Sequence, residues 1–387
     1  MKKYDIAILG AGASGCMCAL QINEKNSVVL IDKASIPAKK LQATGNGRCN
    51  LTNSKITPSV SFYNQDIDGF FKRHSQSDTL DFFALLGLVH YADEEGRVYP
   101  YSNYAKSVID IIGNALSQKK NLSLAMGEEI LSVEKDGDFF IITTSLNTYQ
   151  VKKVVVALGG KANEGIIDAF NIKHRDFIPS LCALKTQKTK LLSGTRISPV
   201  KATALYNNKK IAEERGEVLF KDSGLSGIAI FNLSSAFARK DKFAGNIALD
   251  LTPDLSKEQL FKLLKERKTL PLPISKFFEG FLPNPVAYFI LNKCKFDENK
   301  LCKELTDKQL LQMVDLIKTL VFEVKDCYDN NQVFSGGVLL SALDENLQSK
   351  QVQNLYFTGE GVDVDGICGG FNLQWAWTSG FIVGKSL

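Results

Sequence analysis

The chain has few of the residues that usually build metal and hydrolytic sites. It contains three histidines, His74, His90 and His174, in 387 residues. They are too few and too scattered to indicate a metal cluster or a Ser-His-Asp system. None of the eight cysteines is spaced as Cys-x-x-Cys, so neither a thioredoxin-like redox pair nor a zinc ribbon is indicated. We expect no metal, and cysteines that pack as small, reduced core residues.

Long apolar runs and strong charge are also missing. No stretch approaches the ~18 apolar residues that a membrane helix needs. The first strand-like run begins directly after Met1-Lys-Lys, which leaves no room for a signal peptide. The net charge is only +5, which argues against a nucleic-acid partner bound through a basic face. We expect a cytoplasmic protein without a membrane partner.

The most informative stretch runs from Tyr4 to Asp32. An apolar run rich in strand formers, residues 6–9, leads into Gly10-Ala-Gly12-Ala-Ser-Gly15, a G-x-G-x-x-G pattern. A helical stretch follows, then a second apolar run over 28–31. Asp32 closes that run about 20 residues after the glycines. The order strand, glycine turn, helix, strand, acid predicts a dinucleotide-binding βαβ unit. It does not by itself distinguish FAD from NAD.

Each part of this unit has a physical task. Gly10 allows the tight turn, Gly12 lets a pyrophosphate approach the backbone, and Gly15 lets the helix lie close to the strand. The helix start, at Ala13 and Ser14, offers free N–H groups and a partial positive charge to phosphate. The Asp32 carboxylate can accept hydrogen bonds from an adenosine ribose.

Three later segments combine glycines with polar groups, a composition typical of binding loops. Lys39 to Asn53, KKLQATGNGRCNLTN, is too rich in glycine and polar residues for a helix and is predicted to be a loop. The apolar strand over 153–158 ends in Gly159-Gly160, at what would be the ligand-binding edge of a parallel sheet. Eight glycine and acidic residues lie between 359 and 370, followed by a helix from Asn372 to Val383.

The middle of the chain reads differently. Residues 62–86 are predicted to be one helix with an apolar face, and 88–100 a hairpin. From Thr186 to Leu251 short strand-like pieces, including Ile211 to Ser235, indicate a small barrel or sandwich. Helices then follow to about Leu320, the first of them marked by a capping box at Ser256-x-x-Gln259. Glycine-rich, ligand-binding composition returns only near the end of the sequence. The domain that begins at Met1 is therefore predicted to be completed by the segment that ends at Leu387.

Four segments together resemble a known family: KKLQATGNGRCNLTN, EEGRVYP, GEVLFKDSGLSG and GEGVDVDGICGGFNLQWAWTSG. They are similar to the aminoacetone-oxidase-like, BaiN-type bacterial FAD flavoproteins, and the resemblance spans almost the whole chain. It implies an α/β fold with a glutathione-reductase-like Rossmann FAD-binding domain built from 1–185 and 326–387. It also implies an inserted β-barrel domain over 186–252 and a small helical insert over 253–325.

The resemblance implies a non-covalent FAD. The cofactor-binding residues that it and the βαβ unit imply are Gly10, Gly12, Ala13, Ser14, Asp32, Lys33, Arg48, Cys49, Asn50, Ile130, Gly159, Gly359, Glu360, Gly370, Phe371, Asn372, Leu373 and Gln374. Ile130 is expected beside the adenine. The residues expected around the flavin, where the helix start near Asn372 would face the ring, are Gly359, Glu360, Gly370, Asn372, Leu373 and Gln374. The family commonly has Glu where Asp32 stands, and a Pro- and Gly-rich stretch where KANEGIIDAF follows Gly160.

Function is predicted at the level of an FAD-dependent oxidoreductase, in which the flavin performs the hydride transfer. The leading hypothesis is NAD(P)H-linked reduction of a small unsaturated or carbonyl substrate. Because no second G-x-G-x-x-G is present, NAD(P)H would visit the flavin transiently. The alternatives are a small-amine oxidase that uses oxygen, a tRNA-linked flavoprotein, and a flavin-binding protein without turnover. No residue stands out as the catalytic acid or base.

Overall fold

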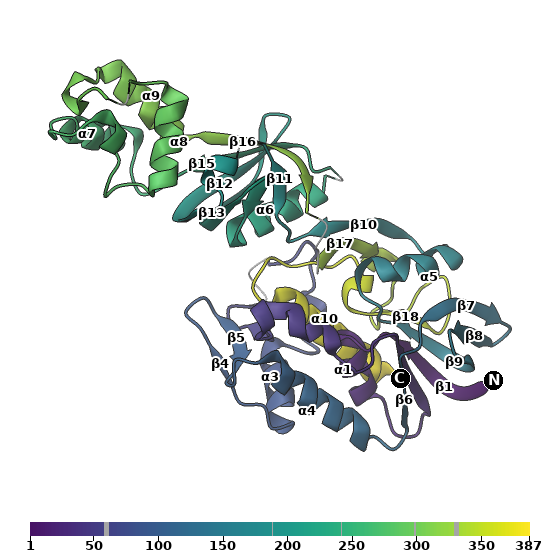
Figure 1. Cartoon of the computed structure of the whole chain (residues 1–387). Helices are drawn as coiled ribbons and strands as arrows, with labels where there is room; N and C mark the ends of the chain where they lie inside the picture. The colour runs from purple at the N-terminus through teal and green to yellow at the C-terminus, as the bar shows by residue number, and fades with distance from the viewer. Residues whose placement is uncertain (58–61, 188, 241, 298, 329–332) are drawn as a thin grey trace. The chain divides into compact units, whose positions relative to one another are not determined.

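The structure, a computed structural model, describes residues 1–57, 62–187, 189–240, 242–297, 299–328 and 333–387 (Figure 1). The chain forms two compact units, each with its own apolar core. Unit 1 comprises Met1–Ile178 and Gln332–Leu387, and unit 2 comprises Pro179–Asn331. The boundaries predicted at 185/186 and 325/326 fall inside strands of unit 2, because the barrel described below begins and ends with strands that span them.

Unit 1 is organised around a sheet with the strand order β6-β2-β1-β9-β8-β7, in which β18 also pairs with β9. The strands are Lys2–Leu9 (β1), Val28–Asp32 (β2), Leu122–Met126 (β6), Ile130–Asp136 (β7), Phe139–Thr144 (β8), Thr148–Val156 (β9) and Leu355–Phe357 (β18). β1 runs parallel to β2 and β9, and β18 runs parallel to β9. The runs 6–9 and 154–156 are fully buried, as expected for parallel strands covered on both faces. The Rossmann-like α/β fold is confirmed.

Two helices from opposite ends of the chain lie side by side on this sheet: α1 (Ala13–Gln21) and α10 (Phe371–Ser386) (Figure 1). Their contact depends on two glycines of α10. A Cβ on Gly380 would lie 2.3 Å from the Ser14 carbonyl oxygen, and one on Gly384 would lie 2.6 Å from the Cys18 carbonyl oxygen. The absence of side chains at these positions lets the two backbones approach closely, which fixes the C-terminal helix against the glycine turn.

The helix predicted over 62–86 is wrong as a single element. The structure has two shorter helices, α2 (Asp68–Phe71) and α3 (Gln76–Leu85). Ser75 separates them: its hydroxyl accepts a 3.2 Å hydrogen bond from the Asp78 N–H, and the Asp78 carboxylate accepts one of 2.7 Å from the Ser75 N–H. This reciprocal capping box begins a new helix at that point, although the apolar pattern continues through it.

The other elements of unit 1 flank the sheet. They are α4 (Ala105–Gln118), α5 (Glu164–Ala169), a three-stranded sheet of β3 (Thr52–Asn53), β5 (Arg97–Pro100) and β4 (His90–Ala92), and a pair of β10 (His174–Ser180) with β17 (Val333–Val338). β4 and β5 pair antiparallel, which confirms the hairpin predicted over 88–100.

Unit 2 contains a closed barrel with the strand order β11-β14-β13-β12-β15-β16. The strands are Leu184–Thr186 (β11), Arg196–Tyr206 (β12), Lys209–Lys221 (β13), Gly224–Ser226 (β14), Gly245–Asp250 (β15) and Leu320–Cys327 (β16). The sequence placed 320–325 in the helical insert, but β16 pairs with β11 and β15 and closes the barrel. The strand-like reading of 211–235 is wrong at its end, since α6 (Ile228–Ala238) is a helix. An apolar run buried on nearly all sides has no period that separates helix from strand.

Three helices lie between β15 and β16 along the chain: α7 (Lys257–Arg267), α8 (Asn284–Cys294) and α9 (Asp307–Lys318). The capping box predicted at Ser256 and Gln259 is confirmed at the start of α7. A mostly buried ion pair joins these helices to the barrel. The Lys318 ammonium lies 2.7 Å from the Asp250 carboxylate and also donates to the carbonyl oxygens of Thr252 and Leu255.

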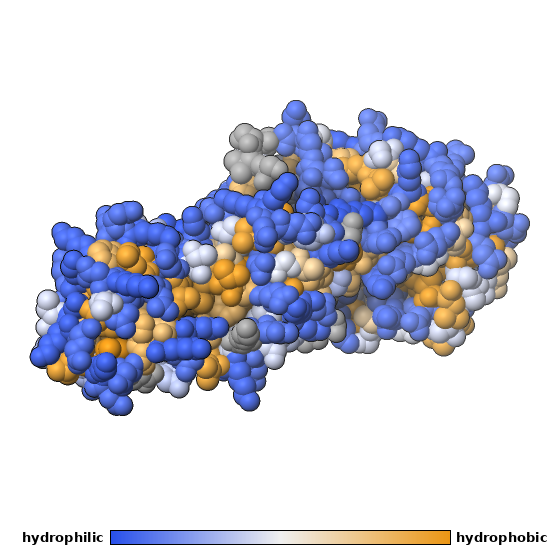
Figure 2. Space-filling model, turned by 90° about the horizontal axis from the view of Figure 1, so that it is seen from above, coloured by the Kyte–Doolittle hydropathy of each residue, from blue (hydrophilic) through white to orange (hydrophobic). Residues whose placement is uncertain are grey.

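The described part of the chain contains neither a candidate membrane-spanning helix nor a candidate metal site. No helix there is long and apolar enough to cross a membrane, and no three His, Cys, Asp or Glu side chains converge as a metal site would require. No disulfide joins any of the eight cysteines among the described residues, and seven of them are buried, as expected for reduced core residues. Figure 2 shows hydrophilic residues over most of the face in view, with apolar residues in separate patches.

Candidate functional site

The first glycine turn joins β1 to α1 and uses its three glycines in two ways. Gly10 has a φ of +105°, and a Cβ on it would lie 2.4 Å from the Ala157 carbonyl oxygen. A Cβ on Gly15 would lie 1.9 Å from the Gly10 carbonyl oxygen. These two glycines therefore serve the packing of β9 and α1 on the turn. A Cβ on Gly12 would meet no described heavy atom within 4 Å, so Gly12 faces open space.

The start of α1 directs backbone donors toward that space. Gly12 is the N-cap, and among the described residues no side chain caps the first turn and no acidic residue lies in it. The N–H groups of a first helical turn have no partner within the helix, and the helix dipole adds partial positive charge. The backbone at Ala13 and Ser14 is therefore suited to an anion.

Three segments that are far apart in sequence meet at this edge of the sheet. Leu9 of β1 is paired with Val156 of β9, and Val156 is paired with Phe357 of β18. Because these strands are parallel, the residues that follow them, 10–14, 157–160 and 358–361, emerge side by side. The Thr358 hydroxyl donates a 3.1 Å hydrogen bond to the Ser14 hydroxyl. The structure thus brings together the predicted ligand residues of the first two glycine turns and of the segment after β18.

Asp32 ends β2 beside the first turn, and its carboxylate is already engaged. Oδ2 accepts a 2.7 Å hydrogen bond from the Ala11 N–H, and Oδ1 accepts one of 2.7 Å from the Ala34 N–H. These bonds tie the glycine turn to the end of β2, a role that the sequence analysis did not predict. Since each carboxylate oxygen can accept more than one bond, the expected ribose contact stays a prediction.

The residues expected near the adenosine lie around the end of β2. Lys33 is exposed, and its ammonium lies 3.9 Å from the Glu129 carboxylate. The Glu128 N–H donates to the Asp32 carbonyl oxygen, and Ile130 begins β7 two residues later, partly buried against the core. The structure therefore places Ile130 close to the strand end that carries Asp32.

The segment Lys39 to Asn53, predicted to be a loop, contains short 3-10 turns. They form the element η1 (Lys39–Gly47), with non-helical backbone at Thr44, Gly45 and Asn46. Glycine and asparagine adopt the left-handed conformation found at 45 and 46 more readily than other residues. The prediction failed because polar and glycine-rich composition disfavours a regular α-helix, but not isolated turns interrupted by such residues.

Arg48, Cys49 and Asn50 follow η1 and differ in what their side chains do. The Arg48 guanidinium lies 4.3 Å from the centre of the Tyr99 ring, in a cation–π contact. Cys49 is fully buried, and burial raises the pKa of its thiol to about 12, so it is not a thiolate at neutral pH. The amide oxygen of Asn50 is buried and has no hydrogen-bond partner among the described residues.

The start of α10 lies against the same segment. Gly370 is the N-cap, with a φ of +101°, and a Cβ on it would lie 2.5 Å from the Thr52 carbonyl oxygen and 2.7 Å from Asn50 Oδ1. No side chain among the described residues caps this helix. The close contact of α10 with residues 50–52 therefore requires glycine at position 370, independently of any contact with a flavin.

The side chains in the first turn of α10 are largely engaged with the protein. Phe371 stacks on Phe62 with ring centres 4.5 Å apart. The Asn372 side chain accepts from the Gly366 N–H at 2.9 Å and donates to the Gly366 carbonyl oxygen at 3.0 Å. Leu373 is partly buried against the core. At these positions the backbone N–H groups are the atoms best placed for a ligand.

Gln374 is a core residue. Its side chain is fully buried, accepts from the Thr52 hydroxyl at 2.7 Å, and donates to the hydroxyls of Thr79 and Thr378 at 2.8 and 3.0 Å. This network joins α10 to β3 and α3. A role for Gln374 in cofactor binding therefore works through the position of α10, and direct contact by its side chain stays untested.

Gly359 and Glu360 form the third part of the edge, in the short turn η7 (Gly359–Gly361). α10 fixes this turn: the Trp375 ring N–H donates to the Gly359 carbonyl oxygen at 3.0 Å, and the Ser379 hydroxyl accepts from the Gly359 N–H at 2.9 Å. Burial raises the pKa of the Glu360 carboxyl to about 7, although the Lys40 ammonium opposes the rise.

Lys40 is a site residue that the sequence analysis missed. Gly159 has a φ of +79°, and a Cβ on it would lie 3.1 Å from the Lys40 ammonium and 3.5 Å from a Glu360 carboxylate oxygen. Lys40 stands directly before the glycine-rich part of KKLQATGNGRCNLTN, which was the available signal. Nothing in the sequence alone shows that its ammonium reaches Gly159, more than a hundred residues further along.

These features suit FAD. The space over Gly12 and the uncapped start of α1 match a diphosphate, and the Lys40 ammonium adds positive charge at the same edge. Buried polar atoms nearly always have partners in folded proteins, so the Asn50 amide oxygen, which has none among the described residues, indicates a missing donor. The N–H of an isoalloxazine ring is such a donor.

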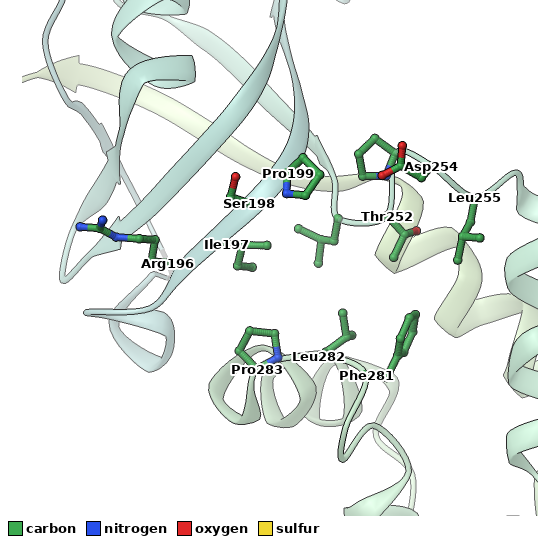
Figure 3. A pocket seen from close by; sticks show the side chains of 12 residues that line it. Arg196, Ile197, Ser198, Pro199, Thr252, Asp254, Leu255, Phe281, Leu282 and Pro283 are labelled. Carbon is green, nitrogen blue, oxygen red and sulfur yellow. The ribbon is translucent and has the colours of Figure 1, made fainter. Parts of the chain in front are cut away.

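A separate cavity of about 350 Å³ lies within unit 2, a volume within the range of small-ligand sites. Its walls come from the start of β12, the segment after β15 and the segment before α8. Figure 3 shows Phe281 and Leu282 on one wall facing Ile197 and Thr252 on the other, with Arg196 directed away. The cavity is lined by both apolar and polar residues, and the sequence analysis gave no indication of it.

Comparison with known proteins covers the whole chain. The family model of the HI0933-like protein Rossmann domain matches residues 4–386. A 3-dehydro-bile acid delta(4,6)-reductase from Clostridium scindens is 29% identical over 98% of each chain. A ribosomal RNA dihydrouridine synthase from Escherichia coli is 27% identical over 100% of this chain and 98% of that protein. Among solved structures, the Escherichia coli quinol fumarate reductase FrdA aligns with a TM-score of 0.51 and 14% identity, over 100% of this chain and 70% of that one.

Proposed function

The chain belongs to the HI0933-like Rossmann-domain family of FAD-dependent oxidoreductases, and from this premise we propose that it reduces a carbon–carbon double bond conjugated with a carbonyl group. NAD(P)H is the proposed electron donor and FAD is bound non-covalently. The observation that carries the proposal is the chemistry shared by two relatives that match over nearly their full length.

The names of those relatives describe the same kind of reaction. A 3-dehydro bile acid with delta(4,6) unsaturation has double bonds conjugated with a ketone. Dihydrouridine is uridine in which the ring double bond next to a carbonyl has been reduced. In both, a hydride adds to the electron-poor end of the double bond and a proton adds to the other carbon. Reduced FAD supplies hydride for such a step.

The protein's own residues bind and shield the cofactor in this proposal. The start of α1 and Lys40 hold the diphosphate, and Asn50 and the start of α10 hold the flavin ring. The first-turn N–H groups of α10 would stabilise negative charge on the reduced ring, because the dipole places partial positive charge there. The eighteen cofactor contacts expected from the sequence remain part of this proposal.

Anaerobic stopped-flow absorbance tests the proposal. NADPH or NADH should bleach the flavin, and a conjugated enone added next should restore the oxidised spectrum, whereas its saturated analogue should not. Bleaching by a small amine, with peroxide formed on admission of air, would instead support the amine-oxidase alternative. Failure of every conjugated acceptor to reoxidise the flavin would overturn the proposal.

A nucleic-acid substrate is the second candidate, and the distribution of charge favours it. Unit 2 contains 25 Lys and Arg against 18 Asp and Glu, whereas unit 1 contains 22 against 24. The chain's excess positive charge therefore lies entirely in unit 2. A groove on its helices is lined by Lys257, Lys293 and Lys308, of which Lys257 lies 2.6 Å from the Asp315 carboxylate. The relatives include ribosomal RNA dihydrouridine synthases, which weakens the sequence-based argument against nucleic acid.

Salt-dependent filter binding of ribosomal RNA tests this candidate. Reversing two charges of the groove, Lys293→Glu with Lys308→Glu, should weaken binding and lower the slope of log K against log salt by about 0.7–0.9 for each lysine that binds a phosphate in the wild type. The matched control reverses two exposed lysines of unit 1, Lys25 and Lys120. Equal effects of the two double variants, or binding insensitive to salt, would count against an RNA surface on unit 2.

A further inference from the structure

Lys40 and Glu360 both lie beside Gly159, in the second glycine turn. They come from η1 and η7, 320 positions apart in the sequence. Both reach the position of an absent Cβ on Gly159, the ammonium to 3.1 Å and a carboxylate oxygen to 3.5 Å. A side chain at 159 would press on both groups. A cation and an acid therefore lie beside the same turn, at the edge where the FAD diphosphate is proposed to bind.

The remaining groups around Glu360 are mostly neutral. From β17 the Phe334 N–H donates to its carboxylate, and Asp365 adds a negative charge nearby. α10 faces the turn with Trp375 and Ser379, and the short turn η2 (Gly160–Asn163) faces it with the Asn163 amide beside Gly361. Lys40 is the one cation among the described groups that act on this carboxyl.

We propose that Lys40 and Glu360 act as a proton-linked recognition pair, in which Lys40 binds the FAD diphosphate and Glu360 takes up one proton when the cofactor binds. The inference rests on the proposed FAD site. It adds Lys40 to the residues that bind FAD and links binding to protonation of Glu360. The proton comes from the buffer and is bound by a carboxylate oxygen. No bond of the cofactor is made or broken.

Electrostatics gives the direction of this uptake. The diphosphate carries two negative charges. In the free protein the positive charge of Lys40 stabilises the Glu360 carboxylate, whereas in the complex Lys40 also interacts with the diphosphate and stabilises the carboxylate less. A bound cofactor also removes water from a carboxyl that is already partly buried. Both changes favour the neutral acid, which can still donate a hydrogen bond to a ribityl hydroxyl and accept one from it.

The pH dependence follows from the pKa of about 7 in the free protein. Below that pH Glu360 is already protonated, so FAD binding takes up no proton and affinity is constant. Above it the carboxylate must be protonated on binding, so affinity falls as pH rises, by at most about tenfold per pH unit. The affinity stops falling above the pKa that Glu360 has in the complex, which is higher than its pKa in the free protein.

The test uses protein from which the flavin has been removed and FAD as the titrant. Flavin fluorescence gives the Kd between pH 5.5 and 8.5, and calorimetry in two buffers of different ionisation enthalpy counts the protons. We expect a flat Kd at low pH, weakening above pH 7, and net uptake approaching about one proton at pH 8. Proton release, or affinity that rises with pH, would overturn the inference, because Glu360 would then bind FAD as the carboxylate.

Three variants separate the pair from its surroundings. Glu360→Gln should keep the low-pH affinity and remove both the pH dependence and the proton uptake. Lys40→Met should weaken FAD binding roughly tenfold or more and reduce its salt dependence. Lys39→Met, the exposed neighbour, should change neither. A wild-type protein that binds no FAD at any pH would refute the proposed FAD site itself, whereas FAD binding without proton uptake would refute only this inference.

Discussion

Replacing Gly12 by alanine should separate cofactor binding from folding. Gly12 has φ −76° and ψ −169°, a conformation open to alanine, and its new Cβ would meet no described atom within 4 Å. Gly→Ala at a compatible site gains about 0.4–1 kcal/mol, while alanine is a poorer N-cap than glycine. The two effects oppose each other, so the melting temperature of the FAD-free variant should stay within a few degrees of wild type.

The cofactor should be affected much more. The methyl group occupies the space through which a diphosphate reaches the first N–H groups of α1. Loss of one charge-assisted hydrogen bond costs about 1.5–3 kcal/mol, which is roughly 10- to 150-fold in Kd. Fluorescence titration of FAD into the FAD-free protein measures this.

A matched variant at Gly15 gives the contrast. Its Cβ would lie 1.9 Å from the Gly10 carbonyl oxygen, so Gly15→Ala should lower the melting temperature of the FAD-free protein and its yield. The reasoning fails if Gly12→Ala binds FAD as wild type does, because the dinucleotide would then not approach Gly12.

Three other changes test single contacts. Gly370→Ala should destabilise the FAD-free protein by at least ~1–2 kcal/mol from left-handed backbone strain alone, and its Cβ would also clash with the Thr52 carbonyl oxygen. Urea unfolding measures the loss, and unchanged stability would contradict the packing described for α10. Lys318→Met should lower the stability of unit 2 by up to about 3–5 kcal/mol, since it leaves the mostly buried Asp250 side chain without its cation. A loss under 1 kcal/mol in chemical denaturation would show the pair to be dispensable. Hydrogen bonds from Lys152 and Ser27 lower the pKa of Asp5 to about 2. The extra stability of the wild type over Asp5→Asn should therefore be complete above about pH 4 and vanish as pH falls through 2. A difference in stability that does not depend on pH would exclude this origin.

The sequence predicted well where the physics is local. The strand, glycine turn, helix and second strand over 4–32 follow from residues within one stretch, and the structure has each of them. The capping boxes at 256–259 and 75–78 are equally local, but only the first was noticed, and the missed one divides α2 from α3. Helix α6 was missed because an apolar run buried on nearly all sides has no diagnostic period.

The candidate site depended more on contacts between distant residues. The pattern of glycines identified the turns, but not which glycine faces open space and which faces backbone. Gly12 and Gly370 look alike in sequence, yet a Cβ on Gly12 would meet no described atom within 4 Å, whereas a Cβ on Gly370 would clash with residues 50–52. Asp32 bonding back to Ala11, and Lys40 reaching Gly159, arise from the tertiary fold and leave no local trace.

The interrupted layout of unit 1 has a consequence for synthesis on the ribosome. β18 and α10 follow unit 2 in the chain, so translation adds 153 residues, Pro179–Asn331, before it reaches them. At about 5–20 residues per second, this takes roughly 8–30 s. Throughout that interval the β9 edge and the α1 face are without their final partners, and at its end unit 2 has every strand of its barrel. The proposed FAD site can therefore be complete only after β18 and α10 have been translated.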